Sequence, residues 1–210
     1  MTVYAVRSPA PVRVVWDGQS QLRTPVASPD LYIPARVMFG TGVPWHNASV
    51  AGTGWEHGTG ASDPGLDADA DTRLFPQARN RSGCDDVLVL SGGQHDAIWA
   101  VTDELTDPGL VAYDALVTYA DAARAAGFTY VIATTMPAIA SVPVQAAFDQ
   151  HNAALLADES NFDATVDIAV GDLDDAGSAY FIGGGIHLSA AGAQAAADLI
   201  SPVLAPFLTP

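Results

Sequence analysis

The chain of 210 residues contains no lysine: its eight basic residues are all arginine, against 24 aspartate and glutamate residues, and its formal net charge is −16. The lack of lysine excludes a Walker-type phosphate loop, a Schiff base and a catalytic ammonium group. A surface this acidic also repels phosphate backbones and anionic membrane surfaces. We therefore expect neither nucleic acid nor membrane insertion.

Cysteine and long hydrophobic runs are also scarce. Cys84 is the single cysteine, so no disulfide can form within the chain. No uncharged run of about 18 apolar residues occurs, and the N-terminal segment has neither the basic start nor the cleavage site of a signal peptide. The sequence predicts a soluble protein without a classical export signal, which is consistent with a cytoplasmic location.

The overall composition is that of a folded domain. With 49% hydrophobic and 15% charged residues, the chain can bury a substantial core. We expect a single domain over residues 1–210, with a short N-terminal arm at residues 1–11. The Gly- and Asp-rich segment 52–71 is the longest irregular piece, and we interpret it as a functional loop.

Short β-rich runs alternate with alanine-rich helical segments, which is the pattern of a parallel sheet with helices on both faces. The expected strands are residues 12–16, 43–50, 86–91, 128–135 and 164–170. Apolar residues at three- and four-residue spacing predict helices over residues 30–39, 113–127, 142–159 and 189–208. Gly127 is expected to end the second helix. The predicted fold is therefore α/β, a three-layer α/β/α sandwich with a five-stranded parallel sheet.

Four polar or glycine-rich segments lie where ligands bind in such sheets, at the carboxyl ends of the strands. Ser20 follows the first strand in "WDGQSQL", Gly52 follows the second, and "GGQHD" (92–96) follows the third. The segment "GGGIHLSAAG" (183–192), which contains His187, leads into the last helix. Because these strand ends share one edge of the sheet, we expect the four segments to meet there.

In this order, the four segments resemble the signature blocks of the SGNH/GDSL hydrolase superfamily, over about residues 12–205. The resemblance implies a flavodoxin-like SGNH hydrolase fold and a serine esterase that needs no cofactor and no metal. Ser20 matches the nucleophile, in the G-Q-S form of some carbohydrate acetylesterases. His187 matches the general base, and the backbone N–H groups of Ser20 and Gly52 match two oxyanion donors.

Two positions depart from the family's pattern. The third block is normally G-x-N-D, with Asn as an oxyanion donor, and here His95 stands at the Asn position. A neutral imidazole keeps one N–H, so we expect His95 to be the third donor. Three residues before His187, where the family has the triad Asp, stands Gly184.

Without that Asp, the Nδ1 proton of His187 needs another acceptor. A backbone carbonyl near residues 183–185 is one alternative, because glycines let the main chain approach closely. The other alternative is a carboxylate of Asp172, Asp174 or Asp175. We favour the carbonyl and expect a Ser20–His187 dyad; in the well-studied protease triad the loss of the Asp costs about 10⁴-fold in rate.

The tryptophans and the remaining acidic residue of the third block have simpler interpretations. Trp55 and Trp99 follow the second and third blocks, so they are candidates for a substrate rim, where aromatic faces suit sugar rings or acyl chains. Trp16 and Trp45 lie in strand runs and are expected in the core. Asp96 is expected to cap the helix that follows it.

No metal site is predicted. The run "DADAD" (67–71) begins like a calcium loop, but Thr72 stands at the position of the required glycine and Ala78 at that of the bidentate glutamate. We interpret the run as an acidic helix start. No spacing indicates catalysis or metal binding for the other histidines, which are His46, His57 and His151.

The function predicted from these residues is that of a carboxylic ester hydrolase acting through an acyl-serine intermediate. Acetyl esters of carbohydrates or of the cell envelope are the leading substrates, because of the G-Q-S form and the tryptophans. The alternative is a catalytically impaired glycan-binding or structural module, for example of a bacteriophage tail, in a virion or oligomeric assembly. A third hypothesis, a lipase-like enzyme for long acyl chains, requires a wide apolar cleft.

Overall fold

The computed structural model describes residues 12–19, 22, 32–57, 65–75, 85–158, 160–182 and 185–209. Its centre is a sheet of five parallel strands in the order β2-β1-β3-β4-β5. The strands are β1 (Val12–Gly18), β2 (Trp45–Asn47), β3 (Asp85–Ser91), β4 (Tyr130–Thr134) and β5 (Ala164–Val166). All five predicted strands are confirmed, and their order is that of flavodoxin-like sheets.

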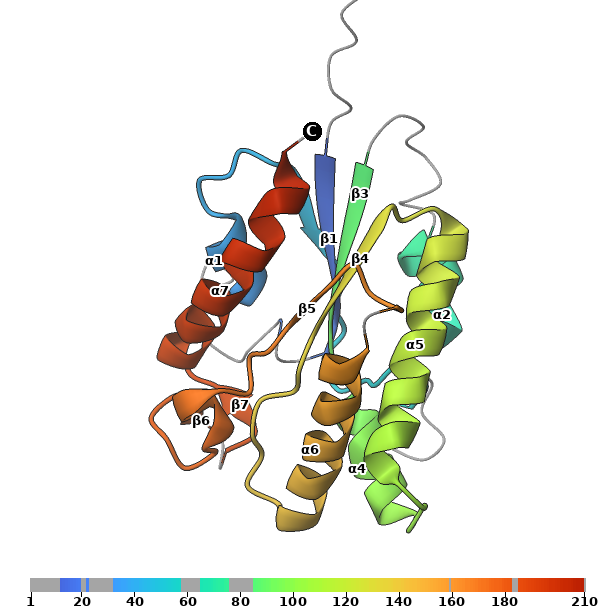
Figure 1. Cartoon of the computed structure of the whole chain (residues 1–210), viewed down its shortest axis with the longest axis vertical. Coiled ribbons are helices and arrows are strands. Elements are labelled where there is room, and N and C mark those ends of the chain that lie inside the picture. The colour runs from blue at the N-terminus through green and yellow to red at the C-terminus, as the bar shows by residue number, and fades with distance from the viewer. Residues whose placement is uncertain are drawn as a thin grey trace, which may run out of the picture.

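Helices cover both faces of this sheet (Figure 1). They are α1 (Ile33–Met38), α2 (Asp67–Arg73), α4 (Gln94–Thr102), α5 (Pro108–Ala126), α6 (Val142–Ala157) and α7 (Ala190–Leu204), which continues into the 3-10 turn η4 (Ala205–Leu208). Helices α1 and α7 pack together on one face, and α5 and α6 pack together on the other. The predicted three-layer α/β architecture is thereby confirmed.

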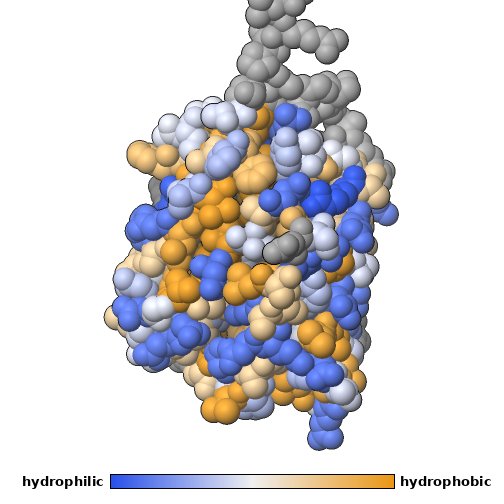
Figure 2. Space-filling view, viewed as in Figure 1, coloured by the Kyte–Doolittle hydropathy of each residue, from blue (hydrophilic) through white to orange (hydrophobic). Residues whose placement is uncertain are grey.

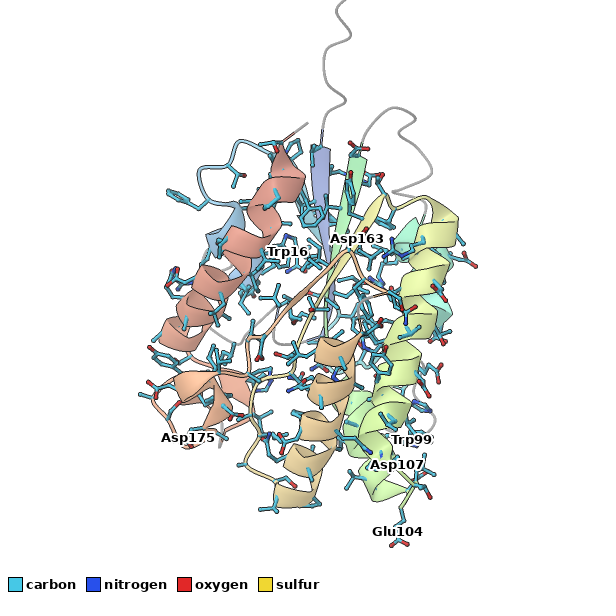
Figure 3. All side chains as sticks on the ribbon, viewed as in Figure 1. Trp16, Trp99, Glu104, Asp107, Asp163 and Asp175 are labelled. Atoms are coloured by element: carbon cyan, nitrogen blue, oxygen red, sulfur yellow. The ribbon has the colours of Figure 1, made fainter. Side chains whose placement is uncertain are left out.

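The alternation of side chains along β1 lets one strand serve two cores. Val14 and Trp16 belong to the core under α1 and α7, whereas Val15 belongs to the core under α5. Figure 3 shows Trp16 inside the molecule, as predicted. Trp45 was predicted to be in the core too, but its side chain is 42% exposed because it lies on the short edge strand β2.

Two local predictions about helices are confirmed. Gly127 follows α5 in the left-handed conformation, and its N–H donates to the carbonyl oxygens of Ala123 and Arg124 at 3.2 and 2.9 Å. The acidic run 67–71 forms the start of α2. In the described part of the chain, no group of three or more His, Cys, Asp or Glu side chains is arranged to hold a metal ion.

The stretch Ala190–Leu208 is the one helical segment, among the described residues, that is long and apolar enough to cross a membrane by length and composition. Its buried residues, which include Ala193, Ala197 and Ile200, pack in the core beneath α1. Figure 2 shows apolar residues gathered along this helix on the visible face. The apolar character of α7 is therefore used in packing against the sheet.

Candidate active site

The end of β1 forms the first side of the site. Gly18 has a φ of 145°, and a Cβ there would lie 1.9 Å from the carbonyl oxygen of Ser91 on β3, so only glycine fits. Gln19 and Leu22 are buried; the Gln19 N–H donates to the Ser91 carbonyl at 3.3 Å, and the Leu22 N–H donates to the Gln19 carbonyl at 3.1 Å. The predicted nucleophile Ser20 lies outside the described residues, between Gln19 and Leu22 in the sequence.

The segment after β2 forms the second side. The Ala48 N–H donates to the Trp16 carbonyl at 2.8 Å and the Val50 N–H donates to the Gly18 carbonyl at 2.9 Å, so this segment follows the end of β1. Gly52 comes next, with a φ of 79°, and no described residue accepts a hydrogen bond from its N–H. That N–H is available to an oxyanion, and its role as a donor stays a prediction.

Asp96 fixes the same loop from α4. Its buried carboxylate accepts the backbone N–H groups of Trp55, Glu56 and His57 at 2.6, 3.0 and 3.0 Å. Burial raises the pKa of Asp96, and these hydrogen bonds offset part of the rise. The prediction that Asp96 caps its own helix was wrong, because α4 already begins at Gln94 and the Asp96 carboxylate turns to another segment.

The two predicted rim tryptophans do not line the cavity. Trp55 is fully buried, with its ring centroid 5.1 Å from that of Tyr119, so its prediction as a rim residue was wrong. Trp99 is half-buried and stacks on the His57 ring at 3.6 Å. His57 Nδ1 in turn lies 3.3 Å from Asp96 Oδ1. All three rings stabilise the loop that carries Gly52, and large apolar surfaces explain the burial of Trp55 better than contact with a ligand does.

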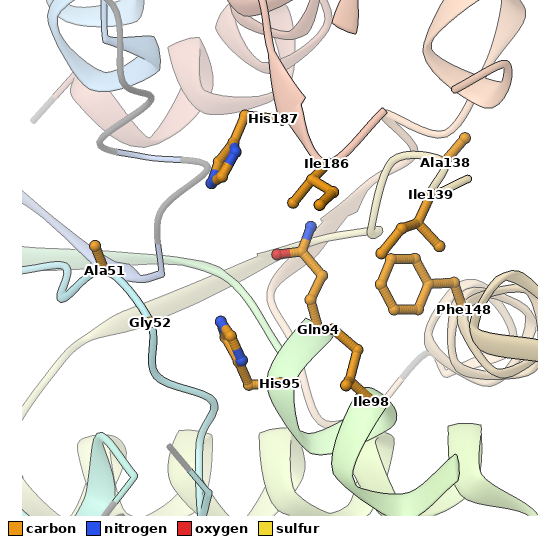
Figure 4. A pocket seen from close by; sticks show the side chains of 10 residues that line it. All are labelled: Ala51, Gly52, Gln94, His95, Ile98, Ala138, Ile139, Phe148, Ile186 and His187. Atoms are coloured by element: carbon orange, nitrogen blue, oxygen red, sulfur yellow. The ribbon is translucent and has the colours of Figure 1, made fainter. Parts of the chain in front are cut away.

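His187 and His95 face one cavity, of about 270 Å³, that Gly52 and Ala51 also line. His187 lies in β7 (His187–Leu188), which pairs with β6 (Phe181–Ile182) in a hairpin that the sequence pattern did not predict. His95 lies in the first turn of α4. Figure 4 shows the two imidazoles on either side of the cavity, with Gly52 beside His95. The structure thus brings three of the predicted site residues together.

Both imidazoles are suited to their predicted roles. Burial lowers the pKa of His187. Burial, and secondarily the neighbouring His187, lowers the pKa of His95. Both groups are therefore neutral at pH 7, so His187 can accept a proton and His95 retains one N–H that can be donated.

No carboxylate of the described residues hydrogen-bonds the His187 imidazole. The three acidic candidates Asp172, Asp174 and Asp175 lie in or beside η3 (Gly171–Asp174), and Figure 3 shows Asp175 at the outside of the molecule. The alternative in which one of them orients His187 is therefore wrong for this structure. The favoured alternative, a carbonyl near residues 183–185, involves Gly183 and Gly184, which lie outside the described residues.

The other half of the cavity is apolar. Figure 4 shows Gln94 extending between the imidazoles and this half, which is lined by Ile98, Ala138, Ile139, Phe148 and Ile186. The lining comes from α4, α6, the segment after β4 and the segment before β7. Sequence reasoning missed these residues, since apolar side chains on separate elements look the same whether they line a cavity or fill a core.

Comparison with known proteins gives structural matches alone. No protein-family model matches the sequence, and no curated protein matches it. A member of the lipolytic protein G-D-S-L family from Veillonella parvula is 17% identical, with a TM-score of 0.73 over 92% of this chain and 98% of that one. A family two carbohydrate esterase from Clostridium thermocellum is 13% identical, with a TM-score of 0.68 over 99% of this chain and 67% of that one.

A third similar structure is a catalytic mutant of the acetylxylan esterase Axe2 from Geobacillus stearothermophilus. It is 16% identical, with a TM-score of 0.62 over 90% of this chain and 91% of that one. At these identities the likeness shows a common fold, and it confirms the fold predicted from the four sequence segments.

Proposed function

We propose that this chain, which has the fold of the SGNH hydrolases, is a carboxylic ester hydrolase that acts through an acyl-serine intermediate. The observation that carries the proposal is the cavity shared by His187, His95 and Gly52 at the carboxyl edge of the sheet. Its neighbour is the end of β1, where Gln19 and Leu22 bracket Ser20 in the sequence. The reaction needs a nucleophile, a base and oxyanion donors, and these residues are of the required types.

The steps follow from the chemistry of each group. Neutral His187 accepts the Ser20 hydroxyl proton as the oxygen attacks the ester carbonyl carbon. The N–H groups of Ser20, Gly52 and His95 stabilise the oxyanion, each such donor being worth roughly 10²- to 10³-fold in rate. His187 then gives its proton to the departing alcohol, and water repeats the sequence on the acyl-serine to release the acid.

The substrate has two halves, and different observations support each. Esters of carbohydrates are supported by the names of two of the similar structures, a carbohydrate esterase and an acetylxylan esterase. The acyl group is proposed to enter the apolar half of the cavity, beyond Gln94. Because this half has room for more than a methyl group, acyl chains longer than acetyl belong to the proposed range.

Turnover of p-nitrophenyl esters from acetate to octanoate tests this function. The wild-type protein is expected to hydrolyse them, with kcat/KM rising by up to about fourfold for each methylene that the cavity buries. Ser20→Ala and His187→Ala are expected to abolish the burst of product. Equal rates for wild type and Ser20→Ala would show that the serine is not the nucleophile.

A second candidate function is that of a glycan-binding module without catalysis. Two observations favour it: His95 stands in place of the family's Asn, and no described carboxylate orients His187. Binding of oligosaccharides in calorimetry, combined with no Ser20-dependent burst, would support this function over the first.

A further inference from the structure

Arg73, the last residue of α2, lies beneath the end of β1 and makes an unusually complete set of hydrogen bonds. Its Nη1 donates to Asp17 Oδ1 at 2.7 Å and to the Ala48 carbonyl at 2.8 Å. Its Nη2 donates to Asp17 Oδ2 at 3.2 Å and to the Leu66 carbonyl at 3.3 Å. One guanidinium therefore joins a strand, the segment after the next strand and the start of its own helix.

Tyr119 on α5 completes the cluster. Its hydroxyl donates to Asp17 Oδ2 at 2.5 Å and accepts from Arg73 Nη2 at 3.2 Å. Burial alone would lower the pKa of Arg73, but the adjacent Asp17 carboxylate raises it above its ordinary value. Asp17 is fully buried, so this ion pair is held away from water and its geometry is fixed by direct contacts.

The two acceptors of Nη1 belong to the two segments that lead to the predicted oxyanion donors. Asp17 directly precedes Gly18 and the turn that continues to Ser20, and Ala48 lies in the segment that continues to Gly52. Backbone bonds between these segments end with the Val50 N–H on the Gly18 carbonyl. Beyond that point, the distance between the Ser20 and Gly52 N–H groups depends on how the two segments are held below.

We propose that Arg73, with Asp17 and Tyr119, is a positioning residue that sets the spacing of the oxyanion donors. None of the three lines the cavity, so the cluster acts through the backbone and does not touch the substrate. This inference rests on the proposed ester hydrolysis. It predicts a specific defect: stabilisation of the transition state weakens while binding of the ester is retained.

The planar fork of arginine is required for this role. It contacts both oxygens of Asp17 and the Ala48 carbonyl from fixed directions, whereas a lysine ammonium is a single point charge on a flexible stem. Arg73→Lys keeps the charge and loses the fork. It therefore separates the geometric role of Arg73 from neutralisation of Asp17.

The test compares wild type, Arg73→Lys, Arg73→Met and Tyr119→Phe on the p-nitrophenyl ester that wild type hydrolyses fastest. Active sites are counted with a fluorophosphonate, so that unfolded protein does not lower kcat. We expect kcat to fall about 10- to 100-fold in the Arg73 variants and less in Tyr119→Phe, with KM within about twofold. Inhibition by phenylboronic acid, which forms a tetrahedral adduct with serine, should weaken by the same factor as kcat/KM.

Arg13→Met is the matched control. Arg13 is buried and pairs with Asp86 at 3.0 Å, but at the opposite end of β1. We expect this variant to lose stability and to keep kcat and the boronic acid affinity within about twofold of wild type. Tyr119→Phe, which lacks one hydroxyl, keeps the test decisive if both Arg73 variants fail to fold.

The outcomes separate this inference from the proposed function. Ser20-dependent turnover with normal kcat and boronic acid affinity in the folded variants overturns the positioning role and leaves the esterase intact. Equal losses in Arg13→Met also overturn it, because the effect would then be general destabilisation. A wild-type protein without any Ser20-dependent turnover overturns both.

Discussion

Two buried arginine–aspartate pairs hold the opposite ends of β1, and they do different work. At the amino end, Arg13 Nε donates to Asp86 Oδ1 at 3.0 Å and links residues that already face each other in the β1–β3 ladder. At the carboxyl end, Arg73 reaches from a helix to Asp17 and to the Ala48 carbonyl. The regular ladder needs little help, whereas the irregular end, where the site lies, is held in place by buried charge.

The largest difference between the two ends is expected for glycine substitutions. Gly18→Ala places a Cβ 1.9 Å from the Ser91 carbonyl oxygen, so we expect the free energy of unfolding to fall by at least about 5 kcal/mol. Gly42→Ala, just before β2, is the control: its φ is 71° and a Cβ there meets nothing within 4 Å. It should cost only about 1–2 kcal/mol. Urea denaturation followed by tryptophan fluorescence measures both, and similar losses would contradict the close-approach argument.

Breaking the ion pairs should give the next largest effect. Arg73→Met leaves Asp17 buried without its cation, and we expect a loss of about 3–5 kcal/mol in the free energy of unfolding. Arg13→Met should cost less, because backbone hydrogen bonds already join its two strands. The double variant Asp17→Leu/Arg73→Met should recover most of the loss in urea denaturation, since no unpaired charge remains. A double variant as unstable as Arg73→Met would show that the cost is not electrostatic.

The carboxyl end should also carry an acid sensitivity, through His151 under the Gly93 turn. Burial lowers the pKa of His151 to about 4, and a Cβ at Gly93 would lie 3.5 Å from its Nε2. As pH falls below about 6.5, the unfolded chain binds this proton first. The free energy of unfolding should therefore fall by about 3 kcal/mol and level off near pH 4. His151→Gln should flatten this part of the curve; an unchanged slope would contradict the assignment.

The smallest expected effect is a displacement of the pH–rate profile. His187 must be neutral to act as a base, and burial lowers its pKa below the ordinary 6.5. The acid limb of kcat/KM should therefore have its midpoint below pH 6.5, with activity lost as pH falls through that midpoint. His151→Gln serves as the control and should leave the midpoint unmoved, because His151 does not line the cavity. A midpoint above pH 6.5 would indicate a carboxylate partner.

Periodicity and strand-end motifs were enough to predict the sheet, its helices and the meeting of three site residues. Each strand reads as an apolar run, and parallel strands place their carboxyl ends at one edge, so Gly52, His95 and His187 had to converge. The β6–β7 hairpin escaped prediction because its strands are two residues long, too short for a pattern.

Partners that are far apart in sequence could not be predicted. Asp17 looked like a turn residue after β1, and nothing local connects it to Arg73 on α2. Asp96 has the sequence of a helix cap, but its carboxylate serves residues 55–57. Trp55 was misplaced for the same reason: its neighbours Tyr119 and Gly92 come from distant elements, and they bury it completely.

The close approach of Gly18 to Ser91 also has a consequence for folding. The two residues belong to strands separated by β2, α2 and the segments around them, so the contact forms only after a long loop has closed. Closing such loops costs entropy before the contact repays it, which makes non-local strand pairing slow. A chain emerging from the ribosome thus carries its serine turn without its final shape until β3 has been made. In refolding experiments, catalytic competence should return together with the paired sheet and not before it.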